Sequence, residues 1–386
     1  MKALVYGLAR SGTAVVERLA ERGDEVVAVD RSLGNEGDLG LLAGVDVLVK
    51  SPGIPGEAPL VLGARERGVP VWSEIELAWR LLPVGTRVVG ITGTNGKTTT
   101  AELLGAIFRA AGRDVAVAGN VGTPLASVRD ADWVVCELSS FQLEDVETLA
   151  CDVAVLLNLE PDHLDRHGTY ERYRDAKLRI FERARACVVP RGSGLEGIEF
   201  AGDDPLPAEP LLRGEHNREN AAAAAAAARA AGVEEEAIAQ ALRSFPGVPH
   251  RLELVGEVDG VRFVNDSKAT NVAAARRALA AYSGEQVHLI LGGSLKGESF
   301  APLAEAIGGN VVSIHLIGEA APELAAALGE VPFDDDGTLA RAVEHAAREA
   351  CRGEVVLLSP ACASYDQFES FEQRGEEFRR LVDGLA

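Results

Sequence analysis

One short segment constrains the fold of this chain more than any other, the glycine-rich run Gly93-Thr94-Asn95-Gly96-Lys97-Thr98. An apolar stretch over residues 87–92 precedes it, and a helical pattern from Lys97 to about Ala111 follows. Glycines let backbone N–H groups approach phosphate oxygens, and the start of a helix adds partial positive charge. Lys97 is placed to bridge the β- and γ-phosphates of a nucleotide, and the Thr98 hydroxyl to bind Mg²⁺. The segment therefore predicts a strand–loop–helix unit that binds phosphate.

The spacing of this loop differs from the standard pattern G-x-x-x-x-G-K-[ST]. With Gly96 and Lys97 fixed, the first glycine would fall at Ile91, and Gly90 is one residue too early. A tight glycine turn before a helix is the structural alternative. The apolar strand before the loop and the Lys-Thr pair after it favour phosphate binding.

Short apolar runs alternate with helical patterns along the whole chain, which is typical of α/β folds with parallel sheets. We expect three domains. The first and last are expected to be Rossmann-like, and the central one to be a P-loop ATPase-type domain with a parallel or mixed sheet. Their predicted limits are residues 1–86, 87–247 and 248–386.

Two local patterns make sharper predictions. The alanine run 221–228 indicates a tightly packed helix over about 217–231, because alanine is the best helix former. Residues 252–265 indicate a β-hairpin that turns at Asp259-Gly260. Residues 191–213 hold many Gly and Pro and are expected to form a loop or irregular strand.

Charge and hydropathy exclude several classes of partner. With 59 Asp+Glu against 38 Lys+Arg, the net charge is -21, which repels phosphate backbones, so we expect no nucleic-acid partner. No apolar run approaches the roughly 18–20 residues of a membrane span, and no signal-peptide pattern is present. The five cysteines are scattered without a C-x-x-C, as is typical of core thiols in a reducing compartment. We expect a cytoplasmic monomer.

The first turn, Gly7–Gly12, is similar to a dinucleotide fingerprint whose middle glycine is replaced by Ala9. Asp30 ends the second predicted strand about where a ribose-binding acid would lie. Taken alone, this pattern suggests NAD, with an ordinary βαβ turn as the alternative. It predicts a phosphate- or ribose-binding crevice without specifying the ligand.

Acidic residues follow the strands of the central segment. Glu137 comes directly after the apolar strand 133–136, where an acid beside a phosphate loop can hold Mg²⁺. A surface glutamate at a helix start is the alternative. Lys177 lies in the predicted helix 170–183 and, on its own, has the pattern of a surface lysine.

Residues 158–167 combine acids with His163 and His167, whose spacing of four could indicate zinc on a helix. Pro161 and Gly168 disfavour a sustained helix there, so one histidine near Mg²⁺ is the preferred interpretation and a solvated polar loop the alternative.

Three polar stretches in the last third are either ligand loops or ordinary turns. They are 249–251 at the predicted domain boundary, 265–271 after a strand, and 359–368 after the last strand. Ligands collect at the carboxyl ends of strands in α/β sheets, which favours the first interpretation for the last two. His288 and His315 are expected to be ordinary core or surface histidines.

Taken together, these motifs resemble the Mur ligases over essentially the whole chain. The phosphate-loop motif is shared with folylpolyglutamate synthases, whereas 265–271, 358–368 and 371–375 resemble the family member that adds D-glutamate. The resemblance rests on GITGTNGKTT (90–99), ELSSFQLE (137–144), DHLDRH (162–167), PHR (249–251), NDSKATN (265–271) and LSPACASYDQF (358–368).

The resemblance implies an ATP-dependent amide ligase of peptidoglycan synthesis. It would add D-glutamate to UDP-N-acetylmuramoyl-L-alanine through an acyl-phosphate intermediate, using ATP and two Mg²⁺ ions. Residues 1–86 would bind the UDP-sugar and 87–247 would bind ATP, while 248–386 would help to close on ATP and hold the amino acid.

The resemblance also implies roles for individual residues. Thr98 and Glu137 would hold one Mg²⁺, and His163 and a carbamylated Lys177 the second, because a carbamate supplies the hard oxygens that Mg²⁺ prefers. Lys97 and Asn120 complete the catalytic set, with Asn120 at the reacting substrate or phosphate. The expected ATP contacts are Gly93, Thr94, Asn95, Gly96, Lys97, Thr98, Thr99, Asn220, Arg251, Asp266 and Lys268. The expected UDP-substrate contacts are Leu8, Ala9, Arg10, Ser11, Asp30, Arg31, Ser51 and Gly53. The expected D-glutamate contacts are Thr270, Lys296, Ser364, Tyr365 and Phe371.

The chain departs from the family pattern in two places. It is compact, with 191–213 trimmed, and Leu295 stands where a glycine is expected beside Lys296. Three rival functions stay open at this point. They are a related ligase that uses L-alanine, a diamino acid or a glutamyl-folate, an NAD-dependent oxidoreductase, and a P-loop regulatory NTPase.

Overall fold

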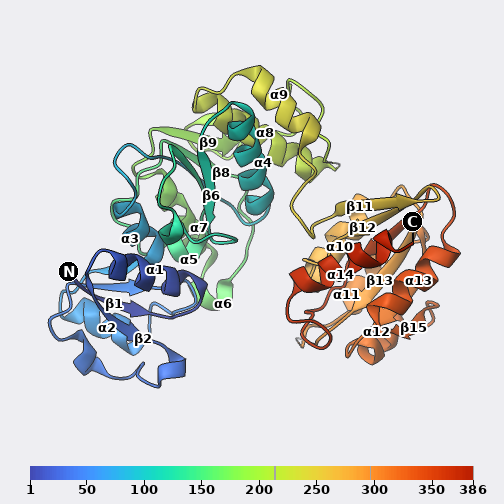
Figure 1. The fold of residues 1–386 in the computed structure, drawn as a ribbon, viewed down its shortest axis with the longest axis horizontal. Coiled ribbons are helices and arrows are strands. Elements are labelled where there is room, and N and C mark those ends of the chain that lie inside the picture. Colours follow the sequence, from blue (N-terminus) through green and yellow to red (C-terminus); the bar gives the residue numbers. More distant parts are fainter. Residues whose placement is uncertain (213, 296, 386) are drawn as a thin grey trace. The chain divides into compact units, whose positions relative to one another are not determined.

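The computed structural model describes residues 1–212, 214–295 and 297–385, which form an α/β protein with three β-sheets (Figure 1). The chain divides into two compact units, Met1–Phe245 and Pro246–Ala386. Two sheets belong to the first unit and one to the second.

The first sheet has four parallel strands in the order β2-β1-β3-β4. Its strands are short and rich in valine, which suits a pleated, buried surface. Pro59 occupies the first position of α2, where a missing N–H has no effect, and the Ser73 side chain caps α3. The elements are β1 (Lys2–Tyr6), α1 (Arg10–Glu21), β2 (Glu25–Val29), η1 (Arg31–Leu33), η2 (Leu39–Leu42), β3 (Val47–Lys50), α2 (Pro59–Glu66), β4 (Val71–Ser73) and α3 (Glu74–Arg80).

The second sheet has six parallel strands in the order β10-β9-β8-β5-β7-β6. Because the strands are parallel, all their carboxyl ends lie along one edge of the sheet. The elements are β5 (Arg87–Thr92), α4 (Lys97–Ala110), β6 (Val115–Gly119), η3 (Leu125–Ser127), β7 (Trp133–Glu137), α5 (Ser140–Leu143), β8 (Val153–Leu156), α6 (Leu164–His167), α7 (Tyr170–Leu178), η4 (Arg179–Phe181), β9 (Ala186–Pro190), β10 (Ile198–Phe200), α8 (Glu215–Ala230) and α9 (Glu235–Ser244).

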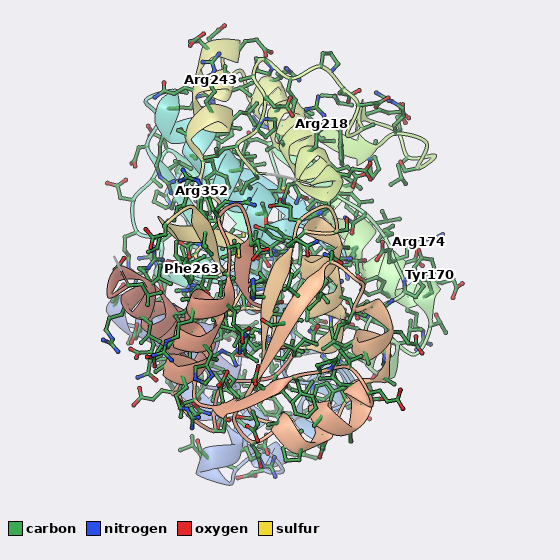
Figure 2. All side chains as sticks on the ribbon, turned by 90° about the vertical axis from the view of Figure 1, so that its right-hand side faces the viewer. Tyr170, Arg174, Arg218, Arg243, Phe263 and Arg352 are labelled. Atoms are coloured by element: carbon green, nitrogen blue, oxygen red, sulfur yellow. The ribbon has the colours of Figure 1, made fainter. Side chains whose placement is uncertain are left out.

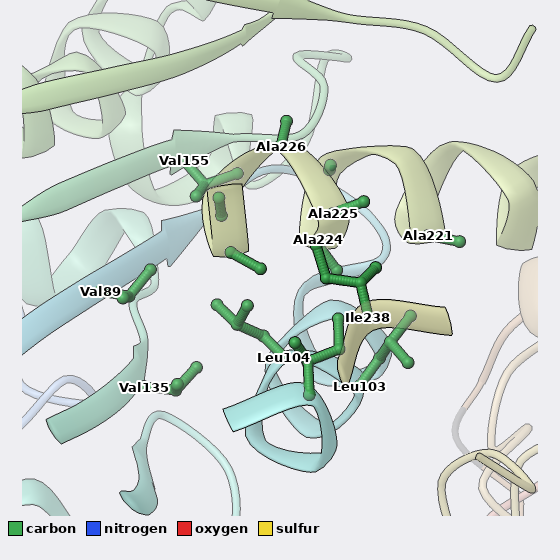
Figure 3. Packing of buried hydrophobic residues seen from close by; sticks show 14 of the residues in the cluster. Val89, Leu103, Leu104, Val135, Val155, Ala221, Ala224, Ala225, Ala226 and Ile238 are labelled. Atoms are coloured by element: carbon green, nitrogen blue, oxygen red, sulfur yellow. The ribbon is translucent and has the colours of Figure 1, made fainter. Parts of the chain in front are cut away.

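The alanine run forms the buried centre of α8 (Figure 3). All eight alanines from Ala221 to Ala228 are buried, against valines of β5, β7 and β8, leucines of α4 and Ile238 of α9. Side chains this small let a helix backbone approach its neighbours closely, so a long helix is buried on nearly every side.

One carboxylate joins the first sheet to the second. The buried Glu76 of α3 accepts hydrogen bonds from the backbone N–H groups of Glu147, Thr148 and Leu149, each at 2.9–3.0 Å, and from the Thr148 hydroxyl. Arg80 adds an ion pair at 2.7 Å. Burial raises the pKa of Glu76, but these hydrogen bonds outweigh it and hold the pKa below its usual value.

The third sheet, in the second unit, has six strands in the order β11-β12-β16-β13-β14-β15, all parallel except the β11–β12 hairpin. At the tip of this hairpin, Asp259 and Gly260 both have positive φ, as a two-residue turn of type I′ requires. The elements are β11 (Glu253–Val258), β12 (Val261–Asn265), α10 (Val272–Ala281), β13 (Val287–Gly292), α11 (Ala301–Ala306), β14 (Val311–Ile317), α12 (Ala321–Leu328), β15 (Asp334–Gly337), α13 (Leu339–Glu349), β16 (Val355–Leu358) and α14 (Phe371–Asp383).

The structure confirms the α/β class with parallel sheets, the hairpin and the alanine helix. The helix expected over 170–183 ends earlier, at Leu178, and continues as the 3₁₀ turn η4. Within 191–213 a short strand, β10, pairs with β9. Among the described residues, no helix combines the length and the apolar character needed to cross a membrane.

Candidate active site

Four neighbouring strands of the second sheet deliver the predicted catalytic segments to one edge. The order β8-β5-β7-β6 places the phosphate loop, after β5, between the loop that follows β8 and Glu137 at the end of β7. Asn120 follows β6, the next strand along. The strand-end rule used on the sequence therefore identifies segments that are neighbours in space.

The phosphate loop needs its glycines. Gly93 has φ 155° and Gly96 has φ 83°, values that side chains rarely allow. A Cβ on Gly96 would lie 2.2 Å from the Asn220 side-chain oxygen, so this glycine also lets α8 approach the loop. Helix α4 begins at Lys97 without a side-chain cap and without an acidic residue in its first turn. Its amino end therefore presents N–H groups and the positive end of the helix dipole, the arrangement that binds anions.

Polar contacts hold the phosphate loop against the segment that follows β8 and against Tyr173 of α7. The Asn158 side-chain oxygen accepts from the backbone N–H of Asn95 at 2.8 Å, and the Thr94 N–H donates to the Asn158 carbonyl at 3.1 Å. The Thr94 hydroxyl lies 2.7 Å from the Tyr173 hydroxyl, and the Glu160 N–H donates to it at 3.0 Å. Burial raises the pKa of Tyr173 to about 12, against the Thr94 hydrogen bond, so Tyr173 is a neutral support for the loop.

Two lysines meet at one carbonyl of the loop. Lys97 Nζ donates to the carbonyls of Gly93 and Thr94, both at 2.9 Å, and Lys177 Nζ donates to the Gly93 carbonyl at 2.8 Å. Lys177 is only 2% exposed. Burial, then the charge of Lys97, lowers the pKa of Lys177 to about 7, although Asp162 and Glu137 attract the charged form. A sizeable fraction of this amine is therefore neutral near pH 7.

The burial of Lys177 corrects the interpretation of this residue from its local sequence, which was a surface lysine. Helix α7 is charged along most of its length, and its Arg174 is exposed at the surface of the protein (Figure 2). Tyr173 and Lys177 lie four residues apart, which makes their side chains neighbours on the helix, and both are buried.

Glu137 is buried at the end of β7 and is joined to Asn120. The Asn120 N–H donates to the Glu137 carbonyl at 2.9 Å, and its side-chain amide donates to the carboxylate at 3.0 Å. Gly119, with φ 119°, allows this approach because a Cβ there would lie 2.1 Å from the Glu137 carbonyl oxygen. The two predicted catalytic residues thus form one hydrogen-bonded pair beside the loop.

The two histidines of the acidic segment differ in environment. His163 begins α6 with φ 51° and is about half exposed, 3.5 Å from the Asp162 carboxylate. His167 is buried between rings, stacked on Phe141 with centroids 5.2 Å apart, and it contacts the Ser140 hydroxyl at 3.0 Å. His167 is part of the packed interior, whereas His163 has a solvent-accessible ring close to the Asp162 carboxylate.

The predicted UDP-substrate residues surround the carboxyl ends of β1, β2 and β3. The Asp30 carboxylate accepts the Leu8 N–H at 2.7 Å, and it caps η1 through Ser32 at 2.9 Å. These bonds lower the pKa of Asp30 below its usual value, the Leu8 contact first. The Ser51 hydroxyl donates to the Gly7 carbonyl at 2.7 Å. The Asp30 carboxylate thus holds the turn after β1 in place through the Leu8 N–H. Of the remaining residues of the set, Ala9 and Gly53 lie in the turns after β1 and β3, Arg10 and Ser11 begin α1, and Arg31 begins η1.

In the second unit, most of the described residues predicted to bind ligand follow β12 or β16, whereas Arg251 precedes β11. The buried Asp266 accepts from the Ser359 hydroxyl at 2.8 Å and from the Leu252 N–H at 3.2 Å, and burial raises its pKa to about 7. The Arg251 charge partly opposes this shift. The Lys268 ammonium lies 5.9 Å from the centre of the Phe371 ring. Ser364 is buried, Tyr365 is 74% exposed, Thr270 is half-buried before α10, and Lys296 lies outside the described residues.

The residues that sequence reasoning left without a role are Asn158, Glu160, Asp162, Tyr173 and Arg374. Four of them contact or face the phosphate loop, and the strand-end position of Asn158 and the Tyr173/Lys177 spacing are the signals that point to them. Arg374 is a buried arginine in the second unit that donates to Ser267, Cys362 and Ala363.

Comparison with known proteins identifies the family. A model of the Mur ligase middle domain matches residues 91–193, and a model of the Mur ligase glutamate ligase domain matches residues 250–362. A UDP-N-acetylmuramoylalanine--D-glutamate ligase from Myxococcus xanthus is 41% identical and is aligned over 100% of this chain and 98% of its own length. A relative of the same name from Acidobacterium capsulatum is 42% identical over 99% of this chain and 96% of its own length. The first alignment spans 449 residues against 386 in this chain, so that relative has segments that this chain lacks.

Solved structures share the fold at lower identity. The UDP-N-acetylmuramate-alanine ligase MurC from Thermotoga maritima has a TM-score of 0.64 and 16% identity, with 100% of both chains covered. The MurF ligase from Thermotoga maritima in complex with ADP has a TM-score of 0.58 and 19% identity over 90% of this chain and 92% of its own. From the two family models and the full-length relatives at about 41% identity, we conclude that this chain belongs to the Mur ligase family.

Proposed function

We propose that this chain is an ATP-dependent amide ligase of peptidoglycan synthesis that adds D-glutamate to UDP-N-acetylmuramoyl-L-alanine through an acyl phosphate. The observation that carries the proposal is the meeting of the phosphate loop, Glu137 and Lys177 at one sheet edge, in a chain whose full-length relatives are named for this reaction. The D-glutamate specificity rests on those relatives. The proposal includes a monomer in the cytoplasm.

The loop fits the triphosphate of ATP. The uncapped start of α4 supplies N–H donors, and Lys97 adds a positive charge beside the Gly93 and Thr94 carbonyls. Gly96 leaves room for Asn220 against the loop. We assign ATP contacts to Gly93–Thr99 and Asn220 in the first unit. Arg251, Asp266 and Lys268 in the second unit are assigned by resemblance.

The donor set at this edge also fits two Mg²⁺ ions, which prefer oxygen ligands. We assign Thr98 and Glu137 to one ion, and His163 with a carbamylated Lys177 to the other. The ions would neutralise phosphate charge as it redistributes during transfer. In this assignment Asn120 orients the Glu137 carboxylate and faces the reacting group.

The environment of Lys177 supports the carbamate. Only a neutral amine attacks CO₂, forming an N–C bond and releasing a proton, and the pKa of about 7 makes the neutral form available. Lys97 lies beside Lys177 and lowers its pKa, so converting one of these two cations to an anion also removes a like-charge repulsion.

The proposed reaction has two steps. A carboxylate oxygen of the L-alanine moiety attacks the γ-phosphorus of ATP, the bond to the bridging oxygen breaks, and ADP leaves. The amine of D-glutamate then attacks the carbonyl carbon, loses a proton and expels phosphate, leaving an amide. Lys97 and the loop N–H groups stabilise charge on the phosphate oxygens, and positioning supplies most of the remaining acceleration.

Substrate residues outside the phosphate site complete the proposal. Residues 1–86 form the UDP-sugar domain, with contacts from Leu8–Ser11, Asp30–Arg31, Ser51 and Gly53. Residues 87–247 form the ATP domain and 248–386 the amino-acid domain, with Thr270, Lys296, Ser364, Tyr365 and Phe371 at D-glutamate. The first and last domains are proposed to be Rossmann-like.

The test is phosphate release from ATP with UDP-N-acetylmuramoyl-L-alanine, scanned across amino acids. Release that requires D-glutamate alone is the expected result. Release with L-alanine, a diamino acid or a glutamyl-folate would reassign the substrate within the same fold. Release without any amino acid would remove the ligase proposal.

A further inference from the structure

The second unit contains a buried row of imidazoles that lies apart from the proposed active-site residues of that unit. His288 of β13 and His315 of β14 are completely buried, and Asp336 of β15 is nearly so. His345 and Glu349 approach them from α13. His288 lies four residues and His315 two residues before the carboxyl ends of their strands, whereas Asp266 and Ser359 directly follow the ends of β12 and β16. The row is therefore not part of the site already described.

Strand alternation explains how the row is formed. His288 precedes Ile290 by two residues and His315 precedes Ile317 by two, so both imidazoles point to the face of the sheet that α13 covers. The rest of that face is an apolar core of the third sheet and α13, α14. Two imidazoles in such a place are costly to bury unless every ring nitrogen has a partner.

Each of these imidazoles uses one nitrogen on a carboxylate. His288 Nε2 lies 2.9 Å from Glu354, and His315 Nδ1 lies 2.9 Å from Asp336. Asp336 also pairs with His345 at 2.5 Å through its other oxygen. Carboxylates accept hydrogen bonds, so both histidines donate here. A carboxylate behind each imidazole is the arrangement that fixes the ring and tautomer of metal-binding histidines.

The opposite nitrogens then present two lone pairs to the same hydroxyl. Ser313 Oγ lies 2.8 Å from His288 Nδ1 and 2.8 Å from His315 Nε2. One hydroxyl has one proton, so it can satisfy only one of these two acceptors. The Glu349 carboxylate lies 3.6 Å from the same His315 Nε2 and adds a further electron-rich group. His288 Nδ1, His315 Nε2 and the Glu349 carboxylate are thus three acceptors that share one hydroxyl proton.

We propose that a divalent cation of the Zn²⁺ class binds here, coordinated by His288 Nδ1, His315 Nε2 and the Glu349 carboxylate. Their ligand atoms lie within 4.8 Å of one another, so modest movement of Glu349 brings them to the separation of about 3.4 Å expected around a tetrahedral zinc ion. Glu349 has a side chain that is 48% exposed, which gives it the freedom to move and gives the ion a route from solvent. Imidazole and carboxylate ligands suit Zn²⁺, with Ser313 or water as the fourth ligand. The ion would tie β13 and β14 to α13.

The test is Zn²⁺ binding to the full chain after treatment with a chelator, with excess Mg²⁺ present to occupy oxygen-ligand sites. Glu349→Gln removes one ligand at an exposed position and leaves the buried core intact. Its matched control is Glu344→Gln on the same helix, an exposed residue paired with Arg348. We expect the wild type and the control to bind one tight Zn²⁺ equivalent that Glu349→Gln binds at least about tenfold more weakly. Glu354→Gln changes the carboxylate that partners His288 and that also accepts the Cys351 N–H, and it should weaken binding by about 10–100-fold.

Two further measurements decide the outcome. In the wild type, Zn²⁺ at about 100 times its Kd should raise the Tm of the second unit by about 5–10 °C, and Co²⁺ should give the visible absorption of a low-coordinate site. Equal Zn²⁺ isotherms for wild type and Glu349→Gln overturn the proposal, as does loss of the tight equivalent in Glu137→Gln instead. A Tm that responds to pH and not to Zn²⁺ overturns it too, because the missing cation is then a proton.

Discussion

Two buried cations, one on α7 and one on α14, each contact loops that follow the strands of a sheet, and they differ in how many hydrogen bonds they donate. Lys177, beside the phosphate loop, donates to a single carbonyl, and its pKa falls to about 7. Arg374, beside the loops after β13 and β16, is 1% exposed and donates to five acceptors contributed by Ser267, Cys362, Ala363 and Gly292. Burial lowers its pKa only to about 10, which leaves it charged. A saturated cation fixes loops in place, whereas an undersaturated one is available for chemistry.

The Arg374→Ala change should have the largest effect, and it tests whether Arg374 is the structural one of the two cations. This change removes five hydrogen bonds to buried acceptors and opens a cavity, so we expect the second unit to lose about 3–5 kcal/mol of stability. Urea unfolding of the second unit, followed by circular dichroism, measures the loss. A loss below about 1 kcal/mol would mean that Arg374 is not the structural member of the pair. Arg380→Ala on the exposed side of the same helix is the control.

Lys97→Ala should have the next largest effect, on rate and not on stability. Removal of one charge-stabilising contact to phosphate typically lowers turnover by at least about a hundredfold. Initial rates of phosphate release measure this loss, and Tm should change little because Lys97 is only half-buried. Arg109→Ala, at the exposed far end of α4, should keep normal turnover. Near-normal turnover in Lys97→Ala would remove the phosphate-loop assignment.

Lys177→Ala sharpens the contrast between the two cations. We expect turnover to fall at least about tenfold and to recover partly when short carboxylates such as acetate are added, because they can replace the carbamate oxygens. The same salts should not restore Arg374→Ala. A crystal structure with both metals bound and a bare amine in the omit map at Lys177 would rule out the carbamate.

Asp266 extends the comparison to a buried group of the opposite charge, and its effect depends on pH. Its pKa of about 7 in the fold lies above its ordinary value of 3.8, so the folded protein holds a proton that the unfolded chain has lost between these pH values. Stability from this group is therefore full below about pH 4 and is lost as pH rises to about 7. Relative to Asp266→Asn, the wild type should lose up to ~1.4 kcal/mol per pH unit across this window. Parallel stability–pH curves for the two proteins would contradict this expectation.

Part of this site could be predicted from the sequence because it obeys a local rule. The phosphate loop and Glu137 stand at the carboxyl ends of apolar strands, and parallel strands bring such positions to one edge. Lys177 could not be placed by local pattern, because α7 carries charges on most of its positions and its buried face has no apolar periodicity. Arg374 was missed for a related reason, since arginine is rarely buried without a carboxylate partner. The imidazole row combines residues 288, 315 and 345, which only the strand order β13-β14-β15 brings together.

The hydrogen bonds from the backbone of residues 147–149 to Glu76 limit which segments of the chain can be exchanged independently between relatives. The carboxylate belongs to the segment before the phosphate loop, but its donors belong to a loop some seventy positions later, in the other sheet. A chimera that exchanges residues 1–86 between relatives would therefore separate an anion from its backbone receptor. Recombination between such genes should succeed when the crossover carries the 144–149 loop along, or when the second parent supplies a loop of the same shape. The smallest unit that can be exchanged at this end of the protein therefore consists of two segments, residues 1–86 and the 144–149 loop, which are separate in the gene.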